Sequence, residues 1–226
     1  MCLNLDFDLE PKRVLIVEDE PLTCHALKLA LDDISQKNPG PELEVAIYHT
    51  YGEVLDFISS NTMVHLAILD FRLGPDTSAT GFDLAKLLRA SASDTKIIFL
   101  TSISDRHQYY TIFKEVNPEG FIIKSELEFK GIERALTQVI AGQTFFSPAI
   151  QDFLRKERSV PKEVEDVDRQ LLFLLSKGAG TRELSEELKM SPSGIEWRKR
   201  RLASLFGLDG GQTHPLIEMA KNKGLL

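Results

Sequence analysis

The first 140 residues alternate short apolar runs with longer stretches in which apolar residues recur at helical spacing. The apolar runs, which predict strands, lie at residues 13–17, 43–48, 65–69, 96–100 and 120–124. The helical patterns lie at residues 21–34, 50–59, 81–89, about 105–116 and about 127–141. Strands that are apolar along their whole length and alternate with helices are typical of a parallel sheet covered on both faces. This pattern therefore predicts an α/β domain.

Polar residues stand at the carboxyl ends of several of these predicted strands. Glu18 and Asp19 follow the first strand, and Asp70 follows the third. Thr101 follows the fourth strand and Lys124 ends the fifth. Because ligands bind beside the carboxyl ends of strands in open α/β sheets, we expect these side chains to lie together. Clustered carboxylates with room for water and phosphate suit Mg²⁺, so we predict a magnesium site with Asp70 as the nucleophile.

Simpler interpretations exist for each residue taken alone. An Asp at a strand tip is commonly a cap or turn residue, and a Lys there is commonly solvated. The joint placement of Asp19, Asp70 and Lys124 favours a site. An α/β phosphatase that uses Asp70 covalently is a further alternative, but Arg72 stands where such enzymes carry a second acid.

The segments "VLIVEDE", "LDFRLG", "FLTS" and "GFIIK" occur in this order over roughly 130 residues. Together they resemble the receiver domain of two-component response regulators, which implies a flavodoxin-like, five-stranded parallel fold. The resemblance implies that Asp70 is the phosphoacceptor, with Thr101 and Lys124 contacting the phosphoryl group. It implies Mg²⁺ ligation by Glu18, Asp19, Asp70 and the backbone carbonyl of Arg72. Phe121 would be the aromatic switch residue that moves with Thr101; its alternative role is core packing.

The charge distribution separates the chain into two parts. Residues 1–154 carry 13 Lys+Arg against 23 Asp+Glu, whereas residues 155–226 carry 14 against 11. An acidic first part joined to a mildly basic second part suggests two modules with different partners. The positive excess of the second part is too small to predict nucleic-acid binding by itself.

The second part contains helical patterns only. After the polar stretch 155–166, which predicts a linker, these patterns lie at residues 166–177, 181–189, 192–206 and 213–223. Thr181 is a predicted N-cap. Ser191 with Pro192 predicts the start of the next helix, and Ser193-x-x-Glu196 offers an alternative capping box slightly later. A helix, a short turn and a second helix form a helix-turn-helix arrangement, whose second helix can enter the DNA major groove.

The helix predicted at 192–206 has one apolar side and one polar side. With Ile195, Leu202 and Phe206 buried, the basic run and the single tryptophan of the chain face outward or flank the outward side. The predicted DNA-contacting residues are Glu196, Trp197, Arg198, Lys199, Arg200 and Arg201. A basic run alone is commonly a solvated helical face, but an outward tryptophan favours a partner, either DNA or another protein.

Residues 164–226 resemble the LuxR-type helix-turn-helix found behind receivers of the NarL/FixJ group. The segment "VEDVDRQLLFLLSKGAGTRELSEELKMSPSGIEWRKRRLASLFGL" has that module's spacing of apolar positions and glycines. Where the family has Thr-Val-Lys at the start of the recognition helix, this chain has Gly194-Ile195-Glu196. Glu196 can accept a hydrogen bond from cytosine. Alternatively, Gly194 and Glu196 indicate an output module that binds a protein rather than DNA.

These observations predict a receiver domain at residues 10–142, a linker with a short helix at 143–163 and an all-α helix-turn-helix domain at 164–226. The resemblance implies a sensor histidine kinase and DNA as partners, with homodimerisation on phosphorylation. It implies a switch that assists its own phosphorylation rather than a metabolic enzyme. Free thiols at Cys2 and Cys24, with no signal-peptide or membrane-spanning pattern, predict a cytoplasmic protein.

Overall fold

The computed structural model describes residues 11–37, 41–59, 63–74, 79–91, 94–103, 105–126 and 128–226. Cys2, residue 10 at the predicted domain start and part of the loop after Asp70 lie outside these residues. The chain divides into two compact units. One, the sheet unit, comprises Met1–Ile103 and Ile112–Ile150; the other, the helical unit, comprises Ser104–Thr111 and Gln151–Leu226.

The sheet unit is built on a parallel sheet with strand order β2-β1-β3-β4-β5-β6. The strands are β1 (Lys12–Val17), β2 (Leu43–Tyr48), β3 (Leu66–Leu69), β4 (Lys96–Thr101), β5 (Gly120–Ile123) and β6 (Phe145–Phe146). The five predicted strands are confirmed to within one residue at each end. The short sixth strand, β6, was not predicted. It pairs with Gly120 and Phe121 of β5 and adds an edge to the sheet.

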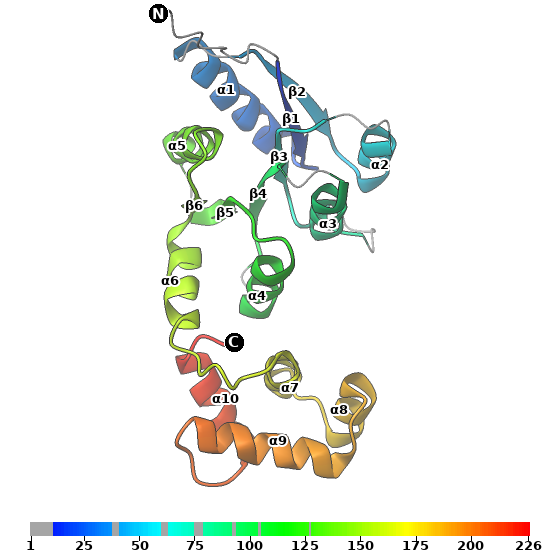
Figure 1. Cartoon of the computed structure of the whole chain (residues 1–226), viewed down its shortest axis with the longest axis vertical. Coiled ribbons are helices and arrows are strands. Elements are labelled where there is room, and N and C mark those ends of the chain that lie inside the picture. The colour runs from blue at the N-terminus through cyan, green and yellow to red at the C-terminus, as the bar shows by residue number, and fades with distance from the viewer. Residues whose placement is uncertain are drawn as a thin grey trace, which may run out of the picture. The chain divides into compact units, whose positions relative to one another are not determined.

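Helices lie on both faces of this sheet (Figure 1). In chain order they are α1 (Pro21–Lys37), α2 (Tyr51–Ser59), α3 (Gly81–Ser91), α4 (Arg106–Glu115), of which Ile112–Glu115 belongs to this unit, and α5 (Phe129–Ile140). At the start of α2, the Glu53 carboxylate accepts from the backbone N–H of Thr50, and the Thr50 hydroxyl accepts from that of Glu53. This reciprocal capping box is the one that the spacing Thr50-x-x-Glu53 predicts.

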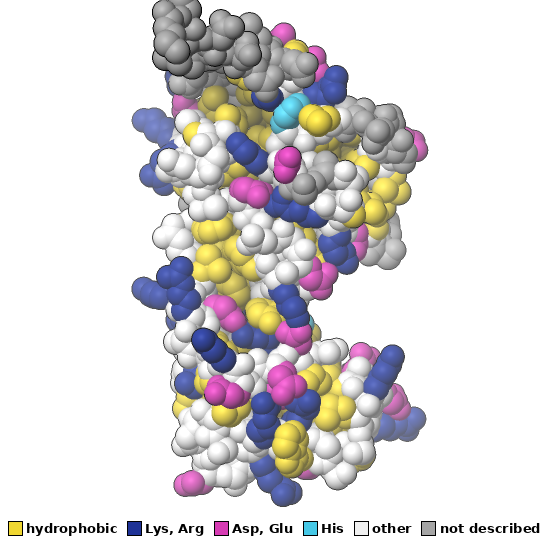
Figure 2. All heavy atoms as spheres, viewed as in Figure 1, with side chains coloured by type: hydrophobic (Ala, Val, Ile, Leu, Met, Phe, Trp, Pro, Cys, Tyr) yellow, Lys and Arg dark blue, Asp and Glu magenta, His cyan; other side chains and the backbone are white. Residues whose placement is uncertain are grey.

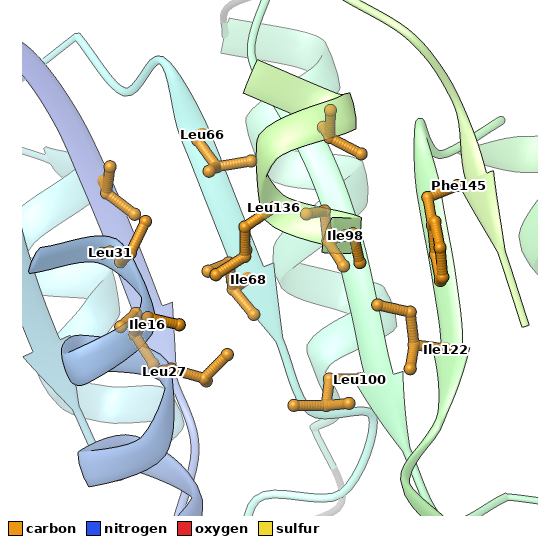
Figure 3. Packing of buried hydrophobic residues seen from close by; sticks show 14 of the residues in the cluster. Ile16, Leu27, Leu31, Leu66, Ile68, Ile98, Leu100, Ile122, Leu136 and Phe145 are labelled. Carbon is orange, nitrogen blue, oxygen red and sulfur yellow. The ribbon is translucent and has the colours of Figure 1, made fainter. Parts of the chain in front are cut away.

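Helices α1 and α5 share one face of the sheet, where alternate strand residues point toward them. Figure 3 shows Leu27 and Leu31 of α1 and Leu136 of α5 packed over Ile16 and Ile68. On the opposite face, Phe113 of α4 packs against Phe121, whose ring also contacts Phe99. A strand that is buried on both faces has no polar side, which explains the continuous apolar runs in the sequence.

The helical unit contains the last five helices of the chain. They are α6 (Pro148–Glu157), of which Gln151–Glu157 belongs to this unit, α7 (Asp166–Ser176), α8 (Thr181–Leu188), α9 (Pro192–Leu205) and α10 (Thr213–Asn222). The N-cap prediction for α8 was wrong by one residue, since Gly180 is the cap and Thr181 is the first helical residue. The predicted polar linker also starts too early, because residues 155–157 continue α6.

The helical unit has its own core, formed by residues of α7 to α10 such as Leu172, Leu184, Leu202 and Leu216. Between α8 and α9 the chain turns over three residues, and Lys189 adopts a left-handed conformation there. Ser191 caps α9 by accepting from the backbone N–H of Gly194, as predicted. Among the described residues, no helix combines the length and apolar character that crossing a membrane requires.

Candidate functional site

The carboxyl ends of β1, β3, β4 and β5 bring the predicted acidic site together. Val17 pairs with Leu69, so Glu18 and Asp70 follow neighbouring strand ends. The Asp70 backbone N–H donates to the Val17 carbonyl over 2.8 Å, which fixes the start of the turn. Thr101 is the last residue of β4 and pairs with Ile123, the residue before Lys124. The sheet register therefore places residues from four separate segments at one edge.

Three carboxylates meet at this edge, and we call them with Lys124 the acidic site. One ligand oxygen from each of Glu18, Asp19 and Asp70 lies within 4.8 Å of the others. Glu18 and Asp70 are buried, whereas Asp19 is exposed and accepts from the backbone N–H of Gly74 over 3.1 Å. Lys124 Nζ donates to Asp70 Oδ2 and to Glu18 Oε1, each over 2.8 Å. Lys124 thus bonds to the two buried acids of this site.

This crowding changes the pKa values of the buried partners. Burial raises the pKa of Glu18 to about 7, since repulsion from Asp70 adds to it and the hydrogen bond from Lys124 only partly opposes it. Burial acts to lower the pKa of Lys124, but its bonds to Asp70 and Glu18 outweigh that effect and raise it. Glu18 therefore binds a proton more readily than an ordinary glutamate, and a cation could compete with that proton.

The donor set fits a hard divalent cation. Lys124 Nζ also lies 2.8 Å from Glu18 Oε2, but this contact lacks hydrogen-bond geometry. Oε2 is therefore a buried carboxylate oxygen without a hydrogen bond from the residues that the structure describes. The Lys124 ammonium offsets part of the cost of burying this oxygen, and a metal ion bound there would offset the rest. All three candidate side-chain ligands are oxygen donors, as Mg²⁺ prefers.

The remaining predicted residues surround this site. Thr101 is buried, and its hydroxyl oxygen accepts from the backbone N–H of Ile103 over 3.3 Å. Phe121 is fully buried in the aromatic packing with Phe99 and Phe113. The Arg72 side chain is exposed, while its backbone N–H donates to Asp70 Oδ1 over 3.3 Å. The Arg72 carbonyl, which is the predicted backbone ligand of the metal, follows the candidate nucleophile Asp70 by two residues.

Helix α9 carries the second candidate site, and the structure divides its basic run. Arg198 and Arg201 donate to the two oxygens of Asp168 in α7, each over 2.8 Å. The Asp168 side chain is fully buried. Lys199 pairs with Glu196 over 2.9 Å, on the same helix. Three of the four predicted cations therefore already have an acidic partner.

The outward face of α9 is formed by residues three or four apart. The exposed residues on this face are Ser193, Trp197, Arg200 and Ser204. Trp197 is 59% exposed, and Arg200 makes no hydrogen bond or ion pair with any other described residue. Figure 2 shows Lys and Arg side chains gathered around hydrophobic side chains over α9. The free face thus offers one cation, one large aromatic ring and two hydroxyl groups.

Comparison with known families identifies the sheet unit. Residues 14–135 match the model of the response regulator receiver domain. The chain belongs to the response regulator family. The acidic site therefore lies in a receiver domain, and members of this family transduce signals rather than convert metabolites.

Known relatives extend over most of this response regulator. Fimbriae Z protein of Salmonella typhimurium is 25% identical over 228 residues, covering 96% of this chain and 100% of the relative. Response regulator UvrY of Escherichia coli is 21% identical and covers 87% and 88%. A structure of RcsB from Salmonella enterica serovar Typhimurium, bound to promoter rprA with the phosphomimetic BeF3⁻, is 18% identical. It covers 92% of this chain and 97% of RcsB with a TM-score of 0.60, and this likeness shows the fold.

Two residues of the receiver site were missed by the sequence analysis. A Cβ atom on Gly81 would lie 1.9 Å from the Asp70 carbonyl oxygen, so only glycine lets α3 start this close to Asp70. The exposed Glu20 places a carboxylate oxygen 3.7 Å from Lys124 Nζ. The third acid of "VEDE" could have signalled Glu20, whereas nothing in the sequence signals the close approach of Gly81.

Proposed function

We propose that this response regulator is a DNA-binding transcription regulator switched by phosphorylation of Asp70. The observation that carries the proposal is the acidic site, where three carboxylate oxygens lie within 4.8 Å and Lys124 bonds to Asp70 over 2.8 Å. Such a site suits a carboxylate nucleophile that must receive a highly charged group, because both a cation position and a lysine adjoin it.

Asp70 is the proposed nucleophile. Its carboxylate oxygen attacks the phosphorus of a phosphohistidine on a sensor histidine kinase. The new P–O bond forms as the P–N bond breaks, and the imidazole keeps the electron pair. Lys124 then balances the charge of the product, to which it is already oriented. Glu18, Asp19, Asp70 and the Arg72 carbonyl would hold Mg²⁺, which screens the charge of the incoming phosphoryl group.

The switch follows from the charge that phosphorylation adds, about −1.5 to −2 at neutral pH. Thr101 turns its hydroxyl toward the phosphoryl oxygens and gives up its bond from the Ile103 N–H. Phe121 can follow only by repacking against Phe99 and Phe113, so the proposed switch requires this aromatic cluster to alternate between two arrangements. Phosphorylation shifts the population toward one of them and favours a homodimer that presents two helix-turn-helix units to DNA.

The DNA-binding part of the proposal rests on α8 and α9. Their helix, three-residue turn and capped second helix suit entry of α9 into a major groove. The named relatives support this role, because the matched RcsB structure contains promoter DNA and a phosphomimetic. We assign Trp197 and Arg200 to the groove, with Glu196 and Lys199 beside them. Arg198 and Arg201 chiefly hold α9 against α7.

One observation favours a protein partner as a second candidate. The pairing of Arg198, Lys199 and Arg201 with acids lowers the positive charge that α9 offers to phosphates. An exposed tryptophan on a helix whose cations are mostly paired also suits binding to another protein. Retention of DNA by the full-length chain separates the two candidates.

The phosphoacceptor is tested by exposing the full-length protein to acetyl phosphate with Mg²⁺ and measuring its intact mass. Wild type should gain one phosphoryl group, and Asp70→Asn should gain none. Asp56→Asn, which changes an exposed acid on α2, is the matched control and should be labelled like wild type. Labelling of Asp70→Asn at the wild-type rate, or none in wild type, would reject the proposal.

DNA binding is tested by retention of random-sequence duplexes at increasing salt. Phosphorylated wild type should retain DNA in a salt-sensitive manner, because release of counterions drives binding to phosphates. Arg200→Ala should weaken retention, whereas Lys221→Ala on α10 should not. Absence of retention in both phosphorylation states would support the protein-binding candidate instead.

A further inference from the structure

We infer that Trp197 selects a thymine in the DNA site, through contact between its indole ring and the thymine C5 methyl group. This inference rests on the proposed DNA-binding function and deepens it, because it assigns a base to a named side chain. Arg198 and Arg201 are bonded to Asp168 and are therefore not available to contact bases. The side chains on the outward face of α9 must then select the base.

The outward face has an apolar centre. Trp197 is 59% exposed, which is unfavourable for so large a ring unless a partner covers it. The Arg201 guanidinium lies over the ring, 5.9 Å from its centre, where Asp168 and the Glu163 carbonyl hold it. Arg201 therefore covers only part of the ring, and Trp197 stays 59% exposed. The ring stays presented to whatever enters against α9.

A major groove offers one methyl group on its base edges, the C5 methyl group of thymine. Every base edge also carries hydrogen-bond donors or acceptors, which an indole ring face cannot satisfy. Desolvation of Trp197 in the groove is therefore favourable opposite thymine and less favourable opposite the other bases. The Trp197 ring thus distinguishes thymine from the other bases by contact with the methyl group rather than by hydrogen bonding.

Arg200 extends this selection by one base pair. It lies three residues after Trp197, about 4.5 Å along the helix axis, and base pairs stack about 3.4 Å apart. The two side chains therefore face neighbouring base pairs. Arg200 is exposed and makes no ion pair with any other described residue, so its fork can bond the O6 and N7 atoms of guanine. The expected element is a thymine beside a guanine, on the same or on opposite strands.

The experiment uses the full-length phosphorylated protein and a random-sequence duplex library, enriched by repeated binding. The enriched duplex is then made with deoxyuridine in place of each thymine in turn, which removes only the methyl group. At one position wild type should lose about fourfold in affinity, the contribution of one buried methyl group. Trp197→Ala should bind more weakly than wild type and should be insensitive to deoxyuridine at that same position.

Two further readouts make the test specific. Trp197 is the only tryptophan, so its fluorescence should change on binding and should change less with the deoxyuridine duplex. Arg200→Ala should lose its preference for guanine at the neighbouring pair by about tenfold. Ser204→Ala, on the same face, is the matched control and should keep both preferences.

The outcomes separate the inference from the function on which it rests. Failure to enrich any duplex would overturn both. Enrichment without sensitivity to deoxyuridine, or equal sensitivity in wild type and Trp197→Ala, would overturn the role of Trp197 and leave DNA binding intact. Because Trp197 is exposed, its replacement should leave thermal unfolding of the helical unit unchanged, and that measurement shows whether the variant is folded.

Discussion

The acidic site and α9 use clustered charges in opposite ways. In the receiver, three carboxylates lie together, Lys124 bonds to two of them, and one buried oxygen of Glu18 has no hydrogen bond from the described residues. In the helical unit, the buried Asp168 receives one hydrogen bond from each of two arginines. A cluster of side chains with the same charge is unfavourable unless a ligand of opposite charge binds it, so such a cluster indicates a binding site. A buried acid that is hydrogen-bonded to basic side chains needs no ligand and indicates a structural role. The comparison can be tested at both sites.

The largest effect is expected at Asp168. Asp168→Ala leaves Arg198 and Arg201 near the core without their carboxylate, and breaking a buried pair in this way costs about 3–5 kcal/mol. The helical unit should therefore unfold at much lower temperature, which the fluorescence of Trp197 reports directly. Phosphorylation of Asp70 should be unchanged. Asp209→Ala removes an exposed acid from the same unit and should unfold like wild type. A loss below about 1 kcal/mol in Asp168→Ala would refute a structural role for the pair.

The second effect concerns pH and Glu18. Because its pKa is raised to about 7 in the folded protein, the folded state favours the protonated form. Without metal, this contribution to stability is present below the ordinary pKa of 4.5 and is lost as pH rises through about 7. The free energy of unfolding should fall by on the order of 2–3 kcal/mol over that interval. Glu18→Gln should lack this fall.

Magnesium should reverse this dependence. If Glu18 is a ligand as proposed, the ion competes with its proton, and Mg²⁺ affinity measured by calorimetry should rise as pH passes through about 7. Glu20→Gln, which alters the neighbouring exposed acid, should keep both the fall in stability and the rise in affinity. Identical pH profiles for wild type and Glu18→Gln would mean that Glu18 is not the titrating group.

The third effect comes from a substitution that changes the geometry of the acidic site but not its charge. Gly81→Ala places a methyl group 1.9 Å from the Asp70 carbonyl oxygen, so α3 or the Asp70 turn must shift. We expect about 1–3 kcal/mol lower stability from the overpacking. Phosphorylation by acetyl phosphate should be slower by roughly tenfold to a hundredfold, because a nucleophile displaced by an ångström loses its alignment.

Gly52→Ala is the matched control for that substitution. Gly52 lies in α2 with no atom within 4 Å of an added Cβ, so alanine there should stabilise the helix by about 0.5–1 kcal/mol. It should leave the phosphorylation rate unchanged. If the two variants behave alike in urea unfolding and in labelling, the close approach of α3 to Asp70 has no functional consequence.

The same contrast explains how much of the molecule could be predicted. The acidic site was predictable because the carboxyl ends of parallel strands meet at one edge, which makes Glu18, Asp70 and Lys124 neighbours once the strands are identified. The pairing of Arg198 with Asp168 was not, because the residues lie 30 apart and the packing of α9 on α7 decides the contact. Helical periodicity showed that the basic run flanks the outward face but could not show what neutralises it.

Two smaller differences have local physical causes. The strand Phe145–Phe146 is only two residues long, too short to show the periodicity by which strands are recognised. Gly180 rather than Thr181 is the N-cap of α8, because Gly180 has an extended backbone and Thr181 is already helical. Among the described residues, no side chain caps this helix by a hydrogen bond. The sequence contains a residue that favours the cap position one place later, and the chain does not use it.

The smallest effect concerns the part-buried pair between Glu196 and Lys199. Their contact spans three residues on one helix, where such a pair contributes about 0.2–0.5 kcal/mol, so Glu196→Gln should barely alter unfolding. It should, however, free Lys199 to contact a phosphate. The plot of log affinity against log salt should then steepen by about one unit. Glu218→Gln makes the same change of net charge on α10 and should leave the slope unchanged. Equal steepening in both variants would mean that net charge, rather than release of Lys199 from its partner, governs binding at α9.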